Sequence, residues 1–214
     1  MKYTAYLFDF DGTLVDSMPS YAAAMLRILD EGNIKYESNL IKIITPLGYR
    51  GTARYYIEHL GLEMAEEEIV ERMRRYAYEE YAYRIQAKPY VIETLQKLKK
   101  QGAHLSVLTA SPHAVLDVCL ERLGIFDLFA NVWSCDDFET TKADPEIYVM
   151  VANKIGKPIG EILFLDDNYN ADKTAASAGM KVCGVYDLSS AEYADDIKRV
   201  SDHYINDFRE LLCL

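Results

Sequence analysis

The chain has 214 residues, half of them apolar, and carries a formal net charge of −11 with an estimated pI of 4.8. This length and apolar content suit one sizeable core, or one core with a smaller appended unit. The negative charge removes any general attraction to nucleic acid or to an anionic membrane, so neither is expected as a partner. A small anionic substrate is not excluded, because a metal ion and a few cationic side chains can reverse the potential inside one cleft.

Cysteine usage and the absence of targeting signals point to a reducing compartment. The cysteines are widely spaced and form no CxxC motif, so they are predicted to be small apolar core residues. The N-terminal apolar run is too short for a signal peptide, and no stretch approaches transmembrane length. A cytoplasmic protein is therefore expected, with cysteines at Cys119, Cys135, Cys183 and Cys213.

The first predicted element is a buried strand over residues 3–8, followed directly by Asp9 and Asp11. Ligands bind at the carboxyl ends of strands in open α/β sheets, because the chain diverges there and leaves a crevice. Two carboxylates this close repel each other, and burying them is costly unless a cation or several donors compensate. Gly12 permits a tight turn and Thr13 offers a hydroxyl. The motif predicts a bound cation, and the alternative is an ordinary turn rich in aspartate.

A block with helical spacing follows this strand. Ser17 is a suitable N-cap for a helix through about Glu31. Residues 33–86 show helical spacing only, with Thr52 predicted to cap one segment. Another segment opens with three glutamates at 66–68 and closes with arginines at 72–75, an order that suits the helix dipole. This block predicts an all-helical insert.

From residue 88 onward, apolar strand patterns alternate with helical ones, as in an α/β fold with a parallel sheet. The first strand must join that sheet, since alone it could bury nothing. The chain is thus predicted to form a core from residues 1–17 and 87–214, with a helical unit from 18–86 inserted between. The strands are predicted at 104–109, 132–134, 162–166, 182–186 and 203–205, and the helices near 91–101, 113–123, 145–155 and 171–178.

Three further segments place polar residues where the first pair of acids should lie in a parallel sheet. Thr109 and Ser111 follow a strand near a helix start, where a hydroxyl and backbone N–H groups can hold an anion. The alternative for them is a simple N-cap. Lys142 precedes another helix, although a lone lysine is usually a solvated charge. Asp166 and Asp167 end a strand, and only one of two adjacent strand residues is expected to reach a given ion.

Taken together, these segments resemble the haloacid dehalogenase superfamily, and more narrowly its phosphoglycolate phosphatase and β-phosphoglucomutase-like group. The resemblance covers nearly the whole chain. It implies a Rossmann-like core with a mostly parallel sheet flanked by helices, and a helical cap inserted after the first strand. The motifs that carry it are, in order, Asp-x-Asp-Gly-Thr, Leu-Thr-Ala-Ser, Lys-Ala-Asp-Pro-Glu-Ile-Tyr, and Leu-Asp-Asp-Asn with a downstream Ala-Gly-Met.

The resemblance also implies a role for each matching residue. Asp9 would be the nucleophile that takes the phosphoryl group, and Asp11 the acid and base. Thr109 would bind the transferring phosphoryl group, and Lys142 would neutralise nucleophile and phosphate. Asp9 and Asp167, with the backbone carbonyl of Asp11, would hold Mg²⁺.

The chain departs from the commonest family pattern near its last motif. Many relatives have Gly-Asp followed four residues later by a second aspartate, whereas Asp166-Asp167 is followed at that distance by Ala171. Asp166 is then an additional or outer-shell partner of the metal. Asp172, one position further on, is predicted to lie on a helix surface.

Substrate choice is expected to come from the insert. Arg50 and Arg54 lie among aromatic residues there, and a guanidinium group binds carboxylate or phosphate bidentately. Together with Ser111 they are candidate substrate ligands. The equally weighted alternative is that both arginines are exposed groups on an amphipathic helix.

The resulting prediction is a Mg²⁺-dependent phosphatase of a small phosphorylated metabolite, acting through an aspartyl-phosphate as a monomer or weak dimer. A phosphomutase of the β-phosphoglucomutase type shares every core residue and is the nearest alternative. A dehalogenase is disfavoured, because a halide leaves without protonation and needs no Mg²⁺. A catalytically silent binding protein on the same fold is the alternative from another class.

Overall fold

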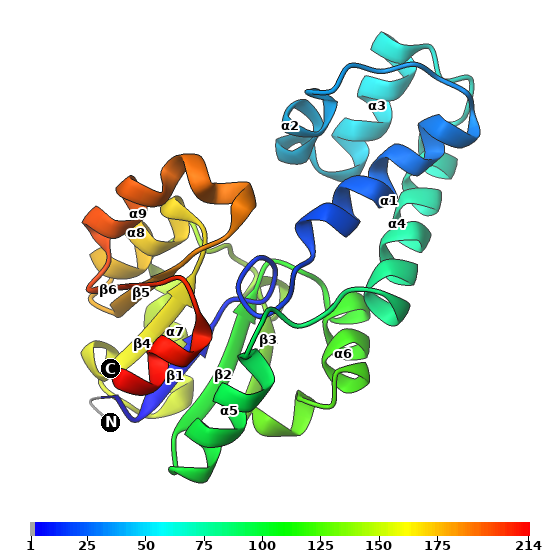
Figure 1. Cartoon of the computed structure of the whole chain (residues 1–214). Helices are drawn as coiled ribbons and strands as arrows, with labels where there is room; N and C mark the ends of the chain where they lie inside the picture. The colour runs from blue at the N-terminus through cyan, green and yellow to red at the C-terminus, as the bar shows by residue number, and fades with distance from the viewer. Residues whose placement is uncertain (1–2) are drawn as a thin grey trace. The chain divides into compact units, whose positions relative to one another are not determined.

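The computed structural model describes residues 3–214, and a six-stranded sheet organises the larger part of them. The strand order is β3-β2-β1-β4-β5-β6, and every neighbouring pair is parallel (Figure 1). The predicted α/β fold is thereby confirmed, with some strand ends shifted by one or two residues. The strands are β1 (Ala5–Phe8), β2 (His104–Thr109), β3 (Asn131–Ser134), β4 (Ile162–Asp166), β5 (Lys181–Val185) and β6 (His203–Ile205).

Helical segments connect the strands, because a parallel pair needs a crossover connection rather than a tight hairpin. The helices of the sheet-containing part are α5 (Val91–Lys100), α6 (His113–Arg122), α7 (Glu146–Ile155), α8 (Tyr169–Ser177) and α9 (Ala194–Val200). Short 3-10 turns complete the connections: η2 (Phe126–Leu128), η3 (Cys135–Phe138), η4 (Ile159–Glu161), η5 (Leu188–Tyr193) and η6 (Phe208–Cys213).

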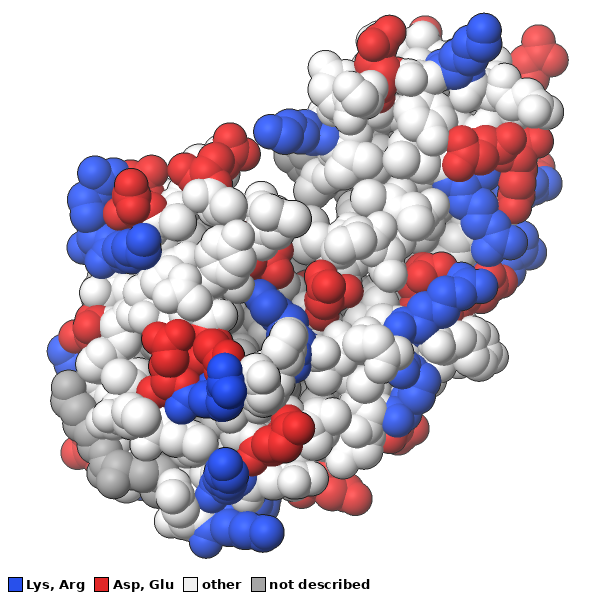
Figure 2. Space-filling view, in the orientation of Figure 1, with Lys and Arg blue, Asp and Glu red and all other residues white. Residues whose placement is uncertain are grey.

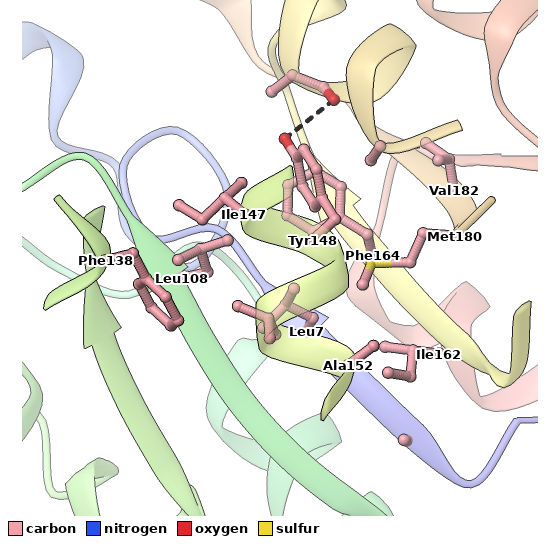
Figure 3. Close-up of a cluster of buried hydrophobic side chains, with 14 of the residues drawn as sticks. Leu7, Leu108, Phe138, Ile147, Tyr148, Ala152, Ile162, Phe164, Met180 and Val182 are labelled. Carbon is pink, nitrogen blue, oxygen red and sulfur yellow. Dashed lines mark hydrogen bonds between the residues drawn. The ribbon is translucent and has the colours of Figure 1, made fainter. Parts of the chain in front are cut away.

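The sheet is buried on both faces, which explains why its central strands read as continuous apolar runs. Leu7 of β1 and Phe164 of β4 face a cluster completed by residues of α7 and α8 (Figure 3). The next residue of β1, Phe8, points to the other face, where its ring lies 6.4 Å from that of Phe208 in η6. Alternation along the strand therefore anchors β1 in two apolar layers, and this fixes the position of the residues that follow it.

The described residues divide into two compact units: those up to Asp16 together with Gln86–Leu214, and Ser17–Ile85. The second unit is all helical, as the sequence predicts, and has its own apolar core around Met25, Tyr56 and Met73. The hydroxyl of Tyr56 donates to the carbonyl of Met25 at 3.1 Å inside this core. Its elements are α1 (Met18–Glu31), α2 (Leu40–Ile44), η1 (Thr45–Leu47), α3 (Gly48–Leu60) and α4 (Glu66–Tyr83).

Two local predictions in the helical unit are wrong. Thr52 caps no helix: it is buried inside α3, and its hydroxyl donates to the carbonyl of Ile44 at 3.3 Å. Helix α4 does not close near the arginines at 72–75 but continues to Tyr83, because its buried stripe extends through Tyr81 and Ala82. Packing of an apolar face therefore outweighs the charge pattern in setting the end of α4.

The charged side chains on one face of the molecule are of mixed sign. On the face shown in Figure 2, lysine and arginine side chains alternate with acidic ones and do not gather into one area. Between residues 3 and 214, no helix combines the length and apolar character that crossing a membrane requires.

One cysteine prediction is wrong, because Cys213 is exposed while the other cysteines are buried. In η6 the inward positions are occupied by Phe208 and Leu211, which leaves Cys213 outside.

Candidate active site

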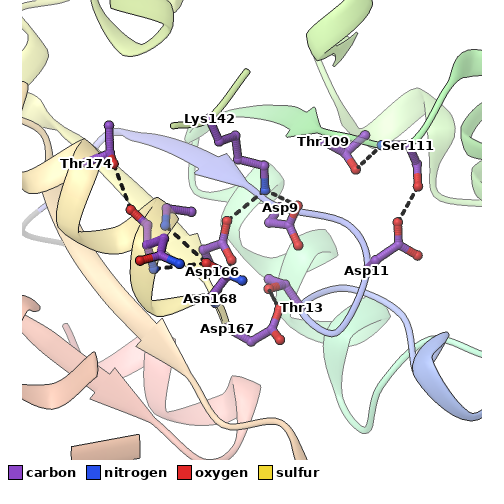
Figure 4. A network of polar contacts seen from close by, with 12 residues as sticks. Asp9, Asp11, Thr13, Thr109, Ser111, Lys142, Asp166, Asp167, Asn168 and Thr174 are labelled. Atoms are coloured by element: carbon purple, nitrogen blue, oxygen red, sulfur yellow. Dashed lines mark hydrogen bonds and ion pairs between the residues drawn. The ribbon is translucent and has the colours of Figure 1, made fainter. Parts of the chain in front are cut away.

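The carboxyl edge of the sheet brings the predicted acids together. Strand β1 lies between β2 and β4, so Asp9 emerges at the middle of that edge. The backbone N–H of Asp9 donates to the carbonyl of Leu165 at 2.8 Å, which extends the pairing with β4 by one residue. Asp9 is thereby held beside Asp166 and Asp167, at and just beyond the end of β4 (Figure 4).

Asp9, Asp166 and Asp167 form a compact group of buried carboxylates. One oxygen from each lies within 4.8 Å of the others, an arrangement that could hold a metal ion. Their exposed fractions are 5%, 1% and 8%. The oxygens of both adjacent aspartates thus lie in this group, and which of the two would contact an ion stays a prediction. Asp167 lies beyond the strand, where the chain has turned, so the strict alternation of strand side chains no longer applies to it.

Lys142 lies between two of these acids. Its Nζ donates to Asp166 Oδ2 at 2.7 Å and also to Asp9 Oδ1, and its side chain is only 14% exposed. The hydroxyl of Tyr148, which is labelled in Figure 3, lies 3.1 Å from the carbonyl oxygen of Lys142 and 3.2 Å from that of Ala171, and so holds the backbone at this point. Lys142 is thus a fixed, buried cation rather than the solvated charge of the alternative interpretation.

Burial and mutual repulsion dominate the electrostatics of the group. Burial raises the pKa of Asp9 to about 7, although Lys142 opposes the rise. Burial and the charges of Asp166 and Asp9 raise the pKa of Asp167 well above its ordinary value. Burial alone would lower the pKa of Lys142, but the charges of Asp166 and Asp9 outweigh it and raise that pKa. When ionised, the three carboxylates would carry more negative charge than one lysine neutralises, so an added cation would stabilise their ionised forms.

Gly12 and Thr13 shape the space beside Asp167. Gly12 has φ +80°, and a Cβ at this position would lie 2.7 Å from both Asp167 oxygens, so only glycine permits this approach. The Thr13 hydroxyl donates to Asp167 Oδ1 at 3.2 Å. Oxygen ligands of this kind suit Mg²⁺, which is bound by one or two carboxylates and keeps several waters. The residues present therefore fit the cation that the sequence predicts.

Asp11 lies on the other side of the same loop and contacts Ser111. The Ser111 hydroxyl donates to Asp11 Oδ2 at 2.5 Å, and the Ser111 N–H donates to Thr109 Oγ1 at 3.0 Å (Figure 4). The Thr109 hydroxyl thus retains its hydrogen for another acceptor. Helix α6 begins beyond them at His113, after an N-cap residue, Pro112, that has no capping side chain. Thr109 and Ser111 are therefore not N-caps of that helix.

Asp172 differs from its prediction. It is completely buried in α8, and neither of its carboxylate oxygens has a hydrogen-bond partner. The sequence places it one position after Ala171, and helix geometry turns this position toward the sheet, because α8 packs on β4 and β5. Burial, followed by the charges of Asp166 and Asp167, raises the pKa of Asp172 well above its ordinary value.

Replacement of Asp172 by asparagine is expected to stabilise the metal-free protein by about 1–3 kcal/mol near neutral pH. The pKa of Asp172 rises on folding from its ordinary value of 3.8. The contribution of this group to the stability of the folded state is therefore fully present below pH 3.8 and is lost as the pH rises. The gain of Asp172→Asn should therefore grow with pH above about 4. Urea unfolding in EDTA measures it, with Asp127→Asn at an exposed position as control. A variant less stable than the wild type at neutral pH would contradict this account.

The two candidate substrate arginines lie in the helical unit. Arg54 Nε contacts Glu66 Oε2 at 2.9 Å, and Arg50 Nη1 contacts Glu66 Oε1 at 3.3 Å. Both side chains are more than half exposed, at 61% and 67%. Glu66 therefore holds both guanidinium groups together on the surface of this unit, and their assignment as substrate ligands remains a prediction.

Two contributors to this edge escaped the sequence interpretation. Tyr148 is the last residue of the Lys-Ala-Asp-Pro-Glu-Ile-Tyr motif, so its place in the motif was a signal that could have found it. Lys88 precedes Pro89 in a connecting segment and has no local signal. Its Nζ donates to the carbonyl of Gly12 at 2.6 Å, beside Asp167.

At the end of this parallel sheet, a buried lysine and several aspartates thus surround a possible metal position. Comparison with known proteins places the chain further. The family model described as haloacid dehalogenase-like hydrolase matches residues 3–179. The chain belongs to this family of hydrolases, and the predicted resemblance is confirmed.

Relatives and solved structures agree with that assignment. The chain is 30% identical over 188 residues to pyrophosphatase PpaX of Bacillus velezensis, covering 86% of this chain and 83% of that one. It is 28% identical over 181 residues to phosphoglycolate phosphatase of Pseudomonas savastanoi pv. phaseolicola, covering 81% and 66%. A Thermotoga maritima crystal structure with a proposed β-phosphoglucomutase assignment matches the fold with a TM-score of 0.85, at 23% identity over 98% and 96% of the two chains. The predicted class, a phosphatase-like hydrolase, is thus confirmed.

Proposed function

We propose that this protein is a Mg²⁺-dependent phosphatase of a small phosphorylated metabolite, and that Asp9 carries the phosphoryl group between two half-reactions. The observation that carries the proposal is the position of Asp9. It is buried at the middle of the sheet edge, contacts Lys142, and shares a possible metal position with Asp166 and Asp167. A carboxylate held in this way suits nucleophilic attack on an anionic phosphate ester.

The metal site would consist of Asp9 and Asp167 with the backbone carbonyl of Asp11, and Asp166 would be an additional or outer-shell partner. Bound there, Mg²⁺ supplies the positive charge that offsets repulsion between a carboxylate and a phosphate ester. Lys142 contributes a second, permanent positive charge on the same nucleophile. Phosphoryl transfer depends mainly on such positioning and charge stabilisation.

The residues of this chain then divide the reaction into two displacements. An Asp9 oxygen forms a bond to phosphorus while the bond from phosphorus to the leaving oxygen breaks. Asp11 gives its proton to that oxygen, and later takes a proton from the water that cleaves the aspartyl-phosphate. The hydrogen bond from Ser111 to Asp11 Oδ2 would orient this carboxyl group. The Thr109 hydroxyl would donate to a phosphoryl oxygen.

Substrate choice is assigned by this proposal to the helical unit, acting as a cap domain. The names of the relatives support a small phosphorylated substrate, since one is called a pyrophosphatase and another a phosphoglycolate phosphatase. Arg50 and Arg54 would fix the far end of such a substrate. Exchange of Glu66 for a substrate carboxylate or phosphate would preserve their charge pairing.

A screen of phosphate esters tests the proposal. Phosphate release should occur from at least one member of a panel that includes 2-phosphoglycolate, pyrophosphate and hexose phosphates. Release should stop in EDTA and return when Mg²⁺ is restored, because the carboxylates would otherwise repel the ester. Interconversion of hexose phosphates that requires a bisphosphate primer, without net phosphate release, would instead identify a phosphomutase. If no member of the panel undergoes phosphate release or interconversion, a binding protein is indicated.

A further inference from the structure

Lys88 connects two loops at the carboxyl edge of the sheet. Its Nζ donates to the carbonyl oxygens of Gly12 and Tyr186, each at 2.6 Å, and to Asp187 Oδ2 at 3.0 Å. Its side chain is 15% exposed, so these contacts lie largely away from solvent. All three hydrogens of the ammonium group are thereby accounted for by oxygens of this unit.

The segment that carries Lys88 is itself fixed to the loop after β1. The N–H of Lys88 donates to the carbonyl of Leu14 at 3.0 Å, and the N–H of Asp16 donates to the carbonyl of Gln86 at 3.0 Å. An antiparallel bridge pairs Val15 with Ala87 between these bonds. These backbone contacts fix the main chain of Lys88 beside the loop after β1, and so limit where its ammonium group can lie.

The carbonyl that Lys88 holds belongs to Gly12, which lies close to Asp167. Gly12 lies so near the Asp167 carboxylate that a Cβ would meet its oxygens at 2.7 Å. Thr13, the next residue, donates to the same carboxylate. Movement of the Gly12 peptide would therefore displace the loop from Asp167.

We propose that Lys88 is a positioning residue of the metal site: its hydrogen bond to Gly12 holds the loop of Asp11 and Gly12 against Asp167. This inference rests on the proposed function, because the Asp11 carbonyl and Asp167 are ligands only there. The ammonium hydrogens of Lys88 are directed to Gly12, Tyr186 and Asp187, which leaves none for a substrate. Lys88 acts through the loop that supplies one ligand and covers another.

The sign of the expected effect separates positioning from electrostatics. Asp187 lies close enough to Asp167 for its charge to raise the pKa of Asp167, and Lys88 neutralises Asp187. If Lys88 acted only through its charge, its removal would leave more negative charge near the site and strengthen cation binding. If it positions the loop, its removal weakens cation binding in spite of that charge.

Isothermal titration calorimetry of the intact protein with MgCl₂ alone tests the inference without reference to turnover. In Lys88→Met the dissociation constant for Mg²⁺ should rise about tenfold, the lower end of the range for outer-shell partners of a metal. At saturating Mg²⁺, kcat should fall by a similar factor of about ten while KM changes little, because Lys88 does not contact substrate. Lys99→Met is the control, since Lys99 also donates to a backbone carbonyl, that of Leu128 at 2.7 Å, but away from this edge.

The double variant Lys88→Met/Asp187→Asn also removes the buried Asp187 charge, which loses its lysine partner in the single variant. It therefore provides the same test even if Lys88→Met alone does not fold. Weaker Mg²⁺ binding in the double variant supports positioning, and unchanged or tighter binding overturns it. An assay of ester hydrolysis by the wild type separates the positioning role of Lys88 from the proposed phosphatase function. Weakened Mg²⁺ binding in the variant, beside a wild type that hydrolyses no ester, would support the positioning role at the metal site and contradict the phosphatase reaction proposed for that site.

Discussion

Asparagine in place of Asp9 is expected to lower phosphate release by about a millionfold, the scale on which loss of an enzyme nucleophile acts. The amide oxygen cannot form the acyl-phosphate bond, and the neutral side chain removes one of three carboxylates from the group with Asp166 and Asp167. Quenched-flow analysis with substrate labelled on phosphorus should find label on the wild-type protein and none on the variant.

The fold should survive this change. Burial raises the pKa of Asp9 to about 7, so ionisation of this side chain opposes folding at neutral pH in the wild-type protein. Asparagine does not ionise, and Lys142 keeps Asp166 as a partner at 2.7 Å. Unfolding in urea and EDTA should therefore shift by only about 1 kcal/mol.

Asp16→Asn is the matched control for Asp9, because it makes the same chemical change seven residues later on an exposed side chain. It should retain full turnover. Substantial phosphate release by pure Asp9→Asn, with no label trapped on any residue of the wild type, would show that water attacks the ester directly. The aspartyl-phosphate mechanism would then be wrong.

Much of the sheet could be predicted because its strands obey one simple rule. Each central strand is buried on both faces and therefore consists of an unbroken apolar run, as Leu7 and Phe8 illustrate by packing on opposite sides. Polar residues directly after such runs must emerge at one edge of a parallel sheet. Thus the proximity of Asp9 and Asp166 followed from strand ends, whereas Lys142 lies between η3 and α7, and only its motif indicated it.

The rest could not be predicted, because it depends on packing between distant segments. Asp172 looked like a surface residue since free carboxylates are seldom buried, and only the seating of α8 on the sheet shows otherwise. Lys88 reaches Gly12 and Asp187 across 76 and 99 residues, and no local pattern encodes a contact of that kind. The burial of an unpaired carboxylate at Asp172 and the long-range contacts of Lys88 could therefore be found only in the structure.

Replacement of Lys142 by methionine is expected to cost the protein both stability and activity. Removal of one partner from a buried ion pair leaves an uncompensated charge, which typically destabilises by about 3–5 kcal/mol. Here the charges left behind are Asp9 and Asp166, both almost fully buried. Loss of the fixed positive charge at the nucleophile should lower kcat by about 10²–10³-fold, as for other preorganised stabilising groups.

The destabilisation should depend on pH in a defined direction. In the wild type the folded-state pKa of Asp9 is about 7 against an ordinary value of 3.8, so its contribution to stability falls as the pH rises between these values. Lys142 opposes that rise in pKa, and its removal must raise the pKa of Asp9 further. The loss then continues above pH 7, and the free-energy difference between wild type and Lys142→Met widens as the pH increases.

Urea unfolding in EDTA at several pH values between about 6 and 9 measures this difference, because stability follows the protons bound by folded and unfolded chains and the two proteins diverge above about pH 7. Lys97→Met, on an exposed position of α5, removes the same charge from the surface and should shift stability by less than about 0.5 kcal/mol. A difference that narrows with rising pH, or that Lys97→Met reproduces, would mean that Lys142 does not hold Asp9 and Asp166 together. If it widens while Lys97→Met stays neutral, the buried lysine is what allows two carboxylates to remain side by side in the absence of a metal ion.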